Sequence, residues 1–200
     1  MDQPKPRSAR RPRKVPTPLD AARLEELALA YVARFATSAG KLDAYCRRKL
    51  RERGHAEQAE GAPPPDIPAL VERFVARGFI DDAGFARAKT DGLLRRGYGA
   101  RRVGQALRAD GIAEQLRADV SPGEAARREA AAAYARRRRL GPFAREPLTG
   151  ADRAVREKQL AALLRAGHDS GHARQVLAAA SPGELDEWIA EAREEEDRTT

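Results

Sequence analysis

Residues 77–112 read RGFIDDAGFARAKTDGLLRRGYGARRVGQALRADGI, and this stretch decides the fold of the chain. Glycine follows arginine at Gly78 and at Gly97, and a third glycine is Gly111. A glycine just beyond a helix adopts a backbone conformation that ends the helix. The stretch therefore predicts short helices, joined by glycine turns, over 82–96 and 100–110.

Helix-start signals recur outside this stretch. Three boxes place a hydroxyl first, a proline second and an acid fourth: Thr17-Pro18-Leu19-Asp20, Ser121-Pro122-Gly123-Glu124 and Ser181-Pro182-Gly183-Glu184. The hydroxyl accepts a backbone N–H without a helical partner, proline lacks that N–H, and the acid favours the positive helix end. We therefore expect these hydroxyls to cap helices. Weaker caps are expected at Asp81, at Ser170 and at Thr149 with Asp152.

The whole chain is predicted to be all-α. It has only 12 valine and isoleucine residues, too few for an extensive sheet, whereas its abundant alanine, leucine, arginine and glutamate favour helices. Apolar residues recur at helical spacing, as at Leu24, Leu27, Tyr31 and Phe35. The expected helices cover 18–36, 40–53, 67–77, 82–96, 100–110, 112–119, 122–139, 150–166, 171–180 and 182–196.

Bulky apolar residues are scarce. Leucine, isoleucine, valine and phenylalanine make 35 of the 200 residues, below the roughly 20 % at which a highly charged chain is suspected of disorder. The chain is therefore either thinly packed between alanine-rich helices or partly disordered. Residues 1–16 are basic and hold four prolines, which predicts a disordered arm.

Three glycines mark an internal repeat. Gly54, Gly111 and Gly167 each follow a leucine by four residues, at intervals of 57 and 56 residues. Each fits the end of the middle helix of a three-helix unit, and a period of this length indicates stacked units. We expect an elongated, curved, solenoid-like chain of three tandem three-helix repeats plus an extra C-terminal helix. The expected boundaries are 17–80, 81–120 and 121–180 for the repeats and 181–200 for the acidic helix and tail.

The charge of the chain predicts an acidic partner. The formal net charge is +8, and 32 of the 38 basic residues are arginines, whose guanidinium groups suit phosphates and carboxylates. The single cysteine, Cys46, forbids an intrachain disulfide, and no apolar run approaches the roughly 20 residues of a membrane helix. We therefore expect a cytoplasmic protein without a membrane partner.

Catalytic and metal-binding motifs are not found in the sequence. His168 and His172 have a spacing that can hold a metal, but the residues between them predict a helix break. Cys46 lies on the apolar side of an expected helix, which favours a buried thiol over a nucleophile. We expect no enzyme, no cofactor and no metal.

The order of the central turns resembles the RecX regulatory family, the modulators of the RecA recombinase. The matching residues are Arg77-Gly78-Phe79-Ile80-Asp81-Asp82, Arg96-Gly97-Tyr98-Gly99 and Leu107-Arg108-Ala109-Asp110-Gly111-Ile112. The resemblance implies three three-helix repeats. It also implies a monomer that lies in the groove of a RecA filament on single-stranded DNA, bridges RecA protomers and limits the filament in recombination, DNA repair and the SOS response. Double-stranded DNA is a weaker expected partner. The long first-repeat loop and the insertion at 141–150 depart from the family pattern.

Basic residues around the Arg-Gly-Tyr-Gly turn form the candidate binding site. They are Arg95, Arg96, Tyr98, Arg101 and Arg102. These residues are either a solvated face or a patch for acidic side chains or phosphates, with Tyr98 packing or stacking, and we favour the patch. Further candidates on the middle helices are Arg108, Arg47, Arg48 and Arg51.

Two charged segments have alternative interpretations. The run Arg136–Arg139 is either a solvated helix end matched to the helix dipole or a contact with DNA or the filament. Residues 184–200 carry eight acids and two arginines, and this helix either masks the basic repeats or aids solubility. The alternative to a RecA-specific function is a general nucleic-acid-binding helical-repeat protein.

Overall fold

The structure is a computed structural model that describes residues 17–56, 64–144 and 153–199. Over these ranges the regular structure is helical, apart from one isolated bridge between Leu19 and His55. The all-α prediction is confirmed. The expectations for residues 1–16 and for the cap at Thr149 and Asp152 lie outside the described residues.

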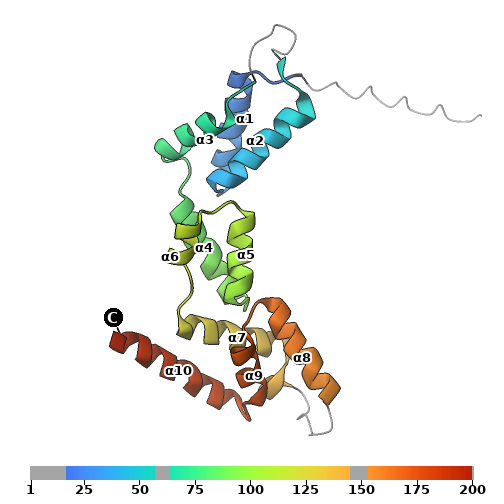
Figure 1. Cartoon of the computed structure of the whole chain (residues 1–200), viewed down its shortest axis with the longest axis vertical. Coiled ribbons are helices and arrows are strands. Elements are labelled where there is room, and N and C mark those ends of the chain that lie inside the picture. The colour runs from blue at the N-terminus through green and yellow to red at the C-terminus, as the bar shows by residue number, and fades with distance from the viewer. Residues whose placement is uncertain (1–16, 57–63, 145–152, 200) are drawn as a thin grey trace, which may run out of the picture.

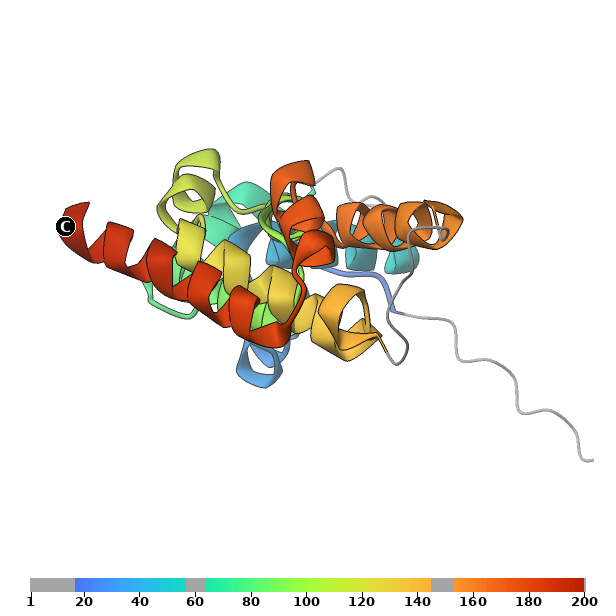
Figure 2. The same ribbon diagram turned by 90° about the horizontal axis from the view of Figure 1, so that it is seen from below.

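The described helices form three units and one added helix along an elongated, curved chain (Figure 1). The first unit contains α1 (Ala21–Arg34), α2 (Ala39–Arg53) and α3 (Ile67–Ala76). The second unit contains α4 (Asp82–Arg95), α5 (Ala100–Ala109) and α6 (Glu114–Asp119). The third unit contains α7 (Glu124–Arg138), the short 3₁₀ helix η2 (Gly141–Phe143), α8 (Arg153–Ala166) and α9 (Ser170–Ala178). The added helix α10 (Pro182–Thr199) packs along α7 (Figure 2). The predicted curved row of three-helix repeats with an extra helix is confirmed.

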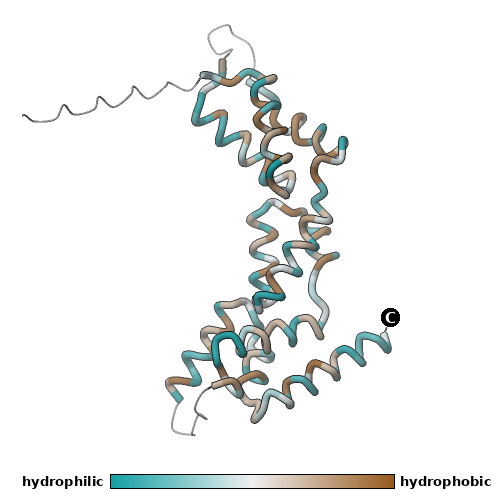
Figure 3. The backbone as a smooth tube through the Cα atoms, turned by 180° about the vertical axis from the view of Figure 1, so that it is seen from behind, coloured by the Kyte–Doolittle hydropathy of each residue, from teal (hydrophilic) through white to brown (hydrophobic). Residues whose placement is uncertain are grey.

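Each unit has its own small apolar cluster. Phe74, Leu107 and Leu163 are almost fully buried in the first, second and third clusters. Apolar segments gather where the helices of a unit face one another (Figure 3). In the third unit, buried alanines of α7 such as Ala131 and Ala135 let neighbouring helices approach closely. Over the described residues, the scarcity of bulky side chains therefore reflects thin helical packing.

The cap predicted at Thr17 is wrong. Asp20 caps α1 instead, since its carboxylate accepts a hydrogen bond from Arg23 N at 2.7 Å. The chain before Asp20 stays extended because Leu19 is fully buried and its N–H donates to Gly54 O at 2.9 Å. Burial of one leucine thus outweighs the local helix-start signal.

Two other predicted caps are also wrong, and each has a substitute. Ser121 makes no cap, because α7 begins at Glu124 without a side-chain cap of its own. A carboxylate from α10 takes this place: Glu196 accepts a hydrogen bond from Ala125 N at 3.1 Å. At α9, Asp169 rather than Ser170 provides the cap.

Two of the predicted caps are confirmed. Ser181 Oγ accepts a hydrogen bond from Glu184 N at 3.3 Å, and Asp81 accepts one from Gly84 N at 2.8 Å. Next to the Asp81 turn, Phe79 is half exposed and packs edge-on against Phe74, whereas Ile80 is buried.

Neighbouring units join through the ends of their second helices. In the first junction, Ser38 at the start of α2 donates its hydroxyl hydrogen to Asp110 O at the end of α5. In the second junction, Gly99 N at the start of α5 donates to Ala166 O at the end of α8 at 3.0 Å. A helix start carries partial positive charge and a helix end partial negative charge, so these contacts are favourable. The helices α2, α5 and α8 therefore form one head-to-tail column.

The repeat glycines end the second helices as predicted. Gly54, Gly111 and Gly167 have φ values of 77°, 75° and 98°. At two of them the backbone of the preceding unit lies where a side chain would start. A Cβ on Gly111 would lie 2.7 Å from Gly40 Cα, and one on Gly167 would lie 2.5 Å from Arg102 N. The glycines therefore serve the junctions as well as the helix ends.

Candidate functional site

The predicted binding residues separate into several groups. Arg96, Tyr98 and Arg102 come together in one hollow at the second junction. Arg95 lies in a different cleft, between α7 and α10. Arg108 is exposed in the last turn of α5.

Arg101 is held by a structural contact. Its Nη2 donates to Leu164 O of α8, and its backbone N–H donates to Gly167 O at 3.2 Å. Both bonds cross the second junction. This guanidinium therefore fastens two units together, which separates it from its neighbour Arg102.

The three arginines predicted on α2 belong to the first unit, far from the hollow along the chain (Figure 1). Arg47 is paired with Asp43 through two hydrogen bonds of 2.6 and 3.0 Å. Arg48 lies 3.6 Å from Glu52, and Arg51 is exposed. An anion at this surface competes with acids of the same helix.

The hollow at the second junction is here called the junction pocket, and it has a volume of about 500 Å³. Its lining is Arg96, Tyr98, Arg102, Tyr134, Arg137, Arg138, Arg165 and Ala166. It thus gathers five guanidinium groups and two phenol rings without a carboxylate. The residues come from the end of α4, the start of α5, and the last turns of α7 and α8. Such a lining suits an anion.

The two tyrosine rings of the junction pocket are covered by arginines. The Arg102 guanidinium carbon lies 5.7 Å from the Tyr98 ring centre, and that of Arg138 lies 5.9 Å from the Tyr134 ring centre. Both distances are typical of cation–π contacts. The rings therefore hold guanidinium groups in position rather than presenting bare faces.

Sequence reasoning missed Arg165 and Tyr134 as parts of this pocket, because they lie in another unit. For Arg137 and Arg138 it left two interpretations open, a solvated helix end or a contact with DNA or the filament. The structure divides the run Arg136–Arg139, since Arg138 lines the junction pocket, whereas Arg136 lies over the Phe143 ring at 5.1 Å and lines the neighbouring cleft.

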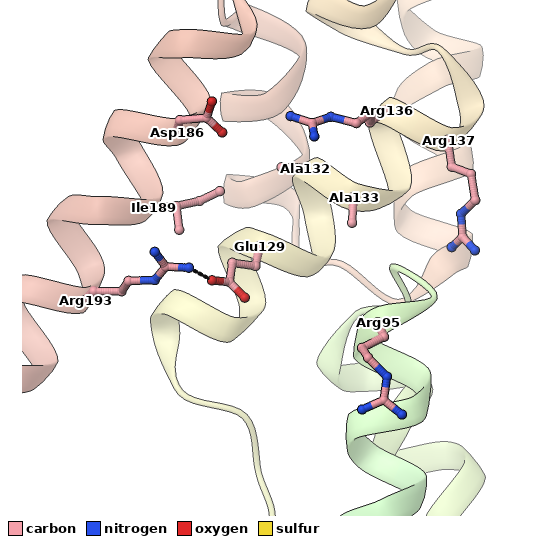
Figure 4. Close-up of a pocket in the computed structure, with 9 residues that line it drawn as sticks. All are labelled: Arg95, Glu129, Ala132, Ala133, Arg136, Arg137, Asp186, Ile189 and Arg193. Carbon is pink, nitrogen blue, oxygen red and sulfur yellow. Dashed lines mark hydrogen bonds and ion pairs between the residues drawn. The ribbon is translucent and has the colours of Figure 1, made fainter.

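The cleft between α7 and α10 has mixed charge (Figure 4). Its volume is about 600 Å³, and Ala132, Ala133 and Ile189 form its apolar part. Glu129 is paired with Arg193 across the cleft. The lining also includes Asp186, Arg95, Arg136 and Arg137. Its acids neutralise part of its positive charge, so it attracts anions less than the junction pocket does.

The histidines are engaged in packing contacts. His168 is buried, and its Nε2 lies 3.0 Å from Gly97 O across the second junction. Burial lowers the pKa of His168 despite this hydrogen bond. Among the described residues, no three histidine, cysteine, aspartate or glutamate side chains are placed to hold a metal ion. Cys46 is buried as predicted, and burial raises the pKa of its thiol to about 11.

An ion cluster links α7, α9 and α10. His172 Nε2 lies 2.8 Å from Glu124 Oε1, and the His172 ring meets the Trp188 ring edge-on. Burial acts to raise the pKa of Glu124, but hydrogen bonds from His172 and Arg128 outweigh it, and the net pKa is lowered. The cluster therefore favours the ionised carboxylate.

The lowered pKa predicts that Glu124 stabilises the chain only where it is ionised. Its contribution is present above the ordinary value of 4.5 and is lost as the pH falls through the lower folded pKa. Since the carboxylate is partly exposed, Glu124→Gln is expected to lower the free energy of unfolding by at most about 1 kcal/mol at pH 7. At pH 3 the loss is expected to shrink. Urea unfolding at both pH values measures it, with Glu187→Gln as the exposed control; equal losses at both pH values contradict the prediction.

No helix in the described part of the chain is long and apolar enough to cross a membrane.

Comparisons with known proteins give a consistent result. The family model for the second three-helix domain of RecX matches residues 81–120. The Regulatory protein RecX of Myxococcus xanthus is 34% identical over 181 residues, which cover 88% of this chain and 93% of that protein. The Regulatory protein RecX of Thermus thermophilus is 37% identical over 112 residues, which cover 56% of this chain and 71% of that protein.

Solved structures share the fold. The crystal structure of RecX from Lactobacillus salivarius matches with a TM-score of 0.57 and 14% identity, covering 83% of this chain and 96% of that one. A second crystal structure, of regulatory protein RecX, matches with a TM-score of 0.58 and 19% identity, covering 78% of this chain and 70% of that one. With a family model on the central unit and a relative matched over nearly its whole length, the chain belongs to the RecX family of regulatory proteins.

Proposed function

We propose that this protein regulates the RecA recombinase by binding the groove of the RecA filament on single-stranded DNA. It bridges neighbouring RecA protomers and limits filament growth and activity. The observation that carries the proposal is membership of the RecX family, with 93% of the Myxococcus relative covered. The protein acts by binding rather than by catalysis, as a cytoplasmic monomer without a cofactor. Double-stranded DNA is a weaker partner.

The shape of the chain supports this function. A curved row of three units follows a long groove better than a compact globule does (Figure 1). Units in series give several modest contacts, and avidity then replaces one tight pocket. We also propose residues 17–80, 81–120 and 121–180 as the repeats, a division supported by the family match at 81–120.

The deciding experiment measures the ATPase of RecA on single-stranded DNA at substoichiometric amounts of this protein. A filament regulator is expected to lower the ATPase at amounts far below those needed to cover the DNA. A general nucleic-acid-binding protein competes for DNA instead. If excess single-stranded DNA abolishes the inhibition, the RecA-specific function is rejected in favour of that alternative.

Charge reversal at the junction pocket is expected to weaken the inhibition. In Arg96→Glu with Arg102→Glu, the half-inhibitory concentration is expected to rise at least about tenfold, since charged hydrogen bonds contribute about 1.5–3 kcal/mol each. Arg101 is left intact because it fastens the second junction. The matched control, Arg34→Glu with Arg87→Glu, changes the charge equally at exposed positions elsewhere. Equal weakening in both variants, or loss of the helical circular dichroism signal, contradicts the prediction.

A further inference from the structure

The junction pocket concentrates positive charge without a counter-charge. Its five guanidinium groups belong to helices of two units, and none of them forms an ion pair within the described residues. On the surfaces of α2 and α7, by contrast, Arg47 and Arg128 have carboxylate partners. Among the pockets of the described residues, this one therefore offers an external anion the strongest electrostatic attraction.

Helix dipoles neutralise only part of this charge. Three helices, α4, α7 and α8, end beside the pocket, and a helix end carries a partial charge of about −0.5. Three such ends contribute about −1.5 and the start of α5 about +0.5, so with the five guanidinium charges roughly +4 remains in the pocket. The attraction of arginines to the negative ends of helices therefore explains why arginines occur here, but it does not explain why five of them converge.

The geometry indicates recognition of phosphate rather than of a base. Arg102 and Arg138 each lie over one face of a tyrosine ring, of Tyr98 and Tyr134 respectively, so those two faces are closed to a stacking base. Guanidinium groups bind phosphate oxygens through two parallel hydrogen bonds. A lining without carboxylates repels no part of a phosphate chain.

We propose that closely spaced phosphate groups bind in the junction pocket and fasten the second unit to the third. The inference deepens the proposed function, on which it rests for the source of the ligand: the backbone of single-stranded DNA. A free oligophosphate has the same chemistry and is the other source. Arg96 and Arg102 belong to the second unit, whereas Arg137, Arg138 and Arg165 belong to the third.

Fastening follows from the placement of these charges. Without a ligand, cations of two units face one another across the junction and repel. This repulsion is opposed by the bond of the Arg101 side chain to Leu164 O and by two backbone bonds, from Gly99 N to Ala166 O and from Arg101 N to Gly167 O. A bound phosphate chain replaces the repulsion by attraction to both units, so these two N–H groups are expected to open less often.

The first experiment measures binding of the full chain to a fluorescent twelve-residue deoxythymidine oligonucleotide, and to an abasic oligonucleotide of the same length, without RecA. The dissociation constants of the two oligonucleotides are expected to agree within about threefold, because the abasic one keeps all the phosphates. In the triple variant Arg96→Ala, Arg138→Ala, Arg165→Ala, the slope of log affinity against log salt is expected to fall by about 2, at roughly 0.7 per lost phosphate contact. Affinity at low salt is expected to fall more than tenfold.

The matched control is Arg34→Ala, Arg87→Ala, Arg174→Ala, which removes the same charge at exposed positions outside the pocket. Its salt slope is expected to stay within about 0.5 of the parent, a margin smaller than one phosphate contact. Equal slope losses in the two variants overturn the pocket assignment in favour of diffuse attraction. Loss of binding to the abasic oligonucleotide alone overturns phosphate recognition.

The second experiment separates the sources and tests fastening. Hydrogen exchange at the amides of Gly99 and Arg101 is followed with the deoxythymidine oligonucleotide or with tripolyphosphate. Slower exchange with the oligonucleotide assigns DNA, and slower exchange with tripolyphosphate alone assigns a free oligophosphate. Unchanged exchange with both ligands at saturation overturns fastening. None of these measurements contains RecA, so failure of RecA regulation and failure of this inference are distinguishable.

Discussion

Replacing Gly97 by alanine is expected to lower the free energy of unfolding by about 2–5 kcal/mol, because a strained backbone conformation and a backbone contact add at this position. Gly97 has φ of 74°, a conformation that costs an alanine about 1–2 kcal/mol. The added Cβ would also lie 2.7 Å from Tyr134 N and 2.8 Å from Tyr134 Cα, both in the backbone of α7. Backbone cannot move aside as a flexible side chain does, so overpacking adds about 1–3 kcal/mol.

The other arginine-glycine turn provides the matched control. Gly78 has φ of 73°, and a Cβ placed on it meets nothing within 4 Å. Gly78→Ala is therefore expected to cost only the backbone part, about 1–2 kcal/mol. Urea unfolding followed by circular dichroism compares the two variants. If they lose equal stability, the second junction does not depend on the contact between Gly97 and α7.

Ending the chain before Ser181 is expected to remove about 5 kcal/mol of stability from the third unit, since burial of one large apolar side chain contributes about 1.5–3 kcal/mol. Leu185 and Ile189 of α10 are buried in the third apolar cluster, and Trp188 packs against it. The truncation also removes Glu196, which caps α7. Urea unfolding is expected to show early loss of the third unit while the first unit keeps its transition. A truncated chain as stable as the full one contradicts this role of α10.

The truncation cannot test whether the acids of α10 mask the basic units, because it unfolds the surface in question. A variant that keeps the packing does test it: Glu187→Gln, Glu194→Gln and Glu195→Gln neutralise exposed acids of α10. If masking occurs, DNA binding at low salt strengthens in this variant. Unchanged affinity rejects masking.

Much of the fold follows from local sequence signals. The glycines at 78, 97 and 111 end helices where predicted, because a positive φ strongly favours glycine whatever surrounds it. The cap at Thr17 failed because burial of Leu19, against residues far along the chain, decides the backbone there. A single sequence shows the first kind of cause but not the second.

The residues of the candidate site also fall into those that local sequence predicts and those that depend on contacts between units. Arg96, Tyr98 and Arg102 could be grouped from the sequence because they share one turn. Arg165 could not be added to them, because its place depends on how α8 meets α5 across the second junction. The bond of Arg101 to Leu164 O could not be predicted either, because it also depends on how α8 meets α5.

The head-to-tail column of α2, α5 and α8 fixes the spacing between the junctions of the protein. The distance between the two junctions is the length of the second helix that joins them, α5. With ten residues and a rise of about 1.5 Å per residue, this distance is about 15 Å. Residues inserted between the helices of a unit leave that distance unchanged. A whole turn deleted from α5 shortens it by about 5.4 Å. On a partner that repeats at fixed intervals, such a deletion moves every contact beyond it out of phase.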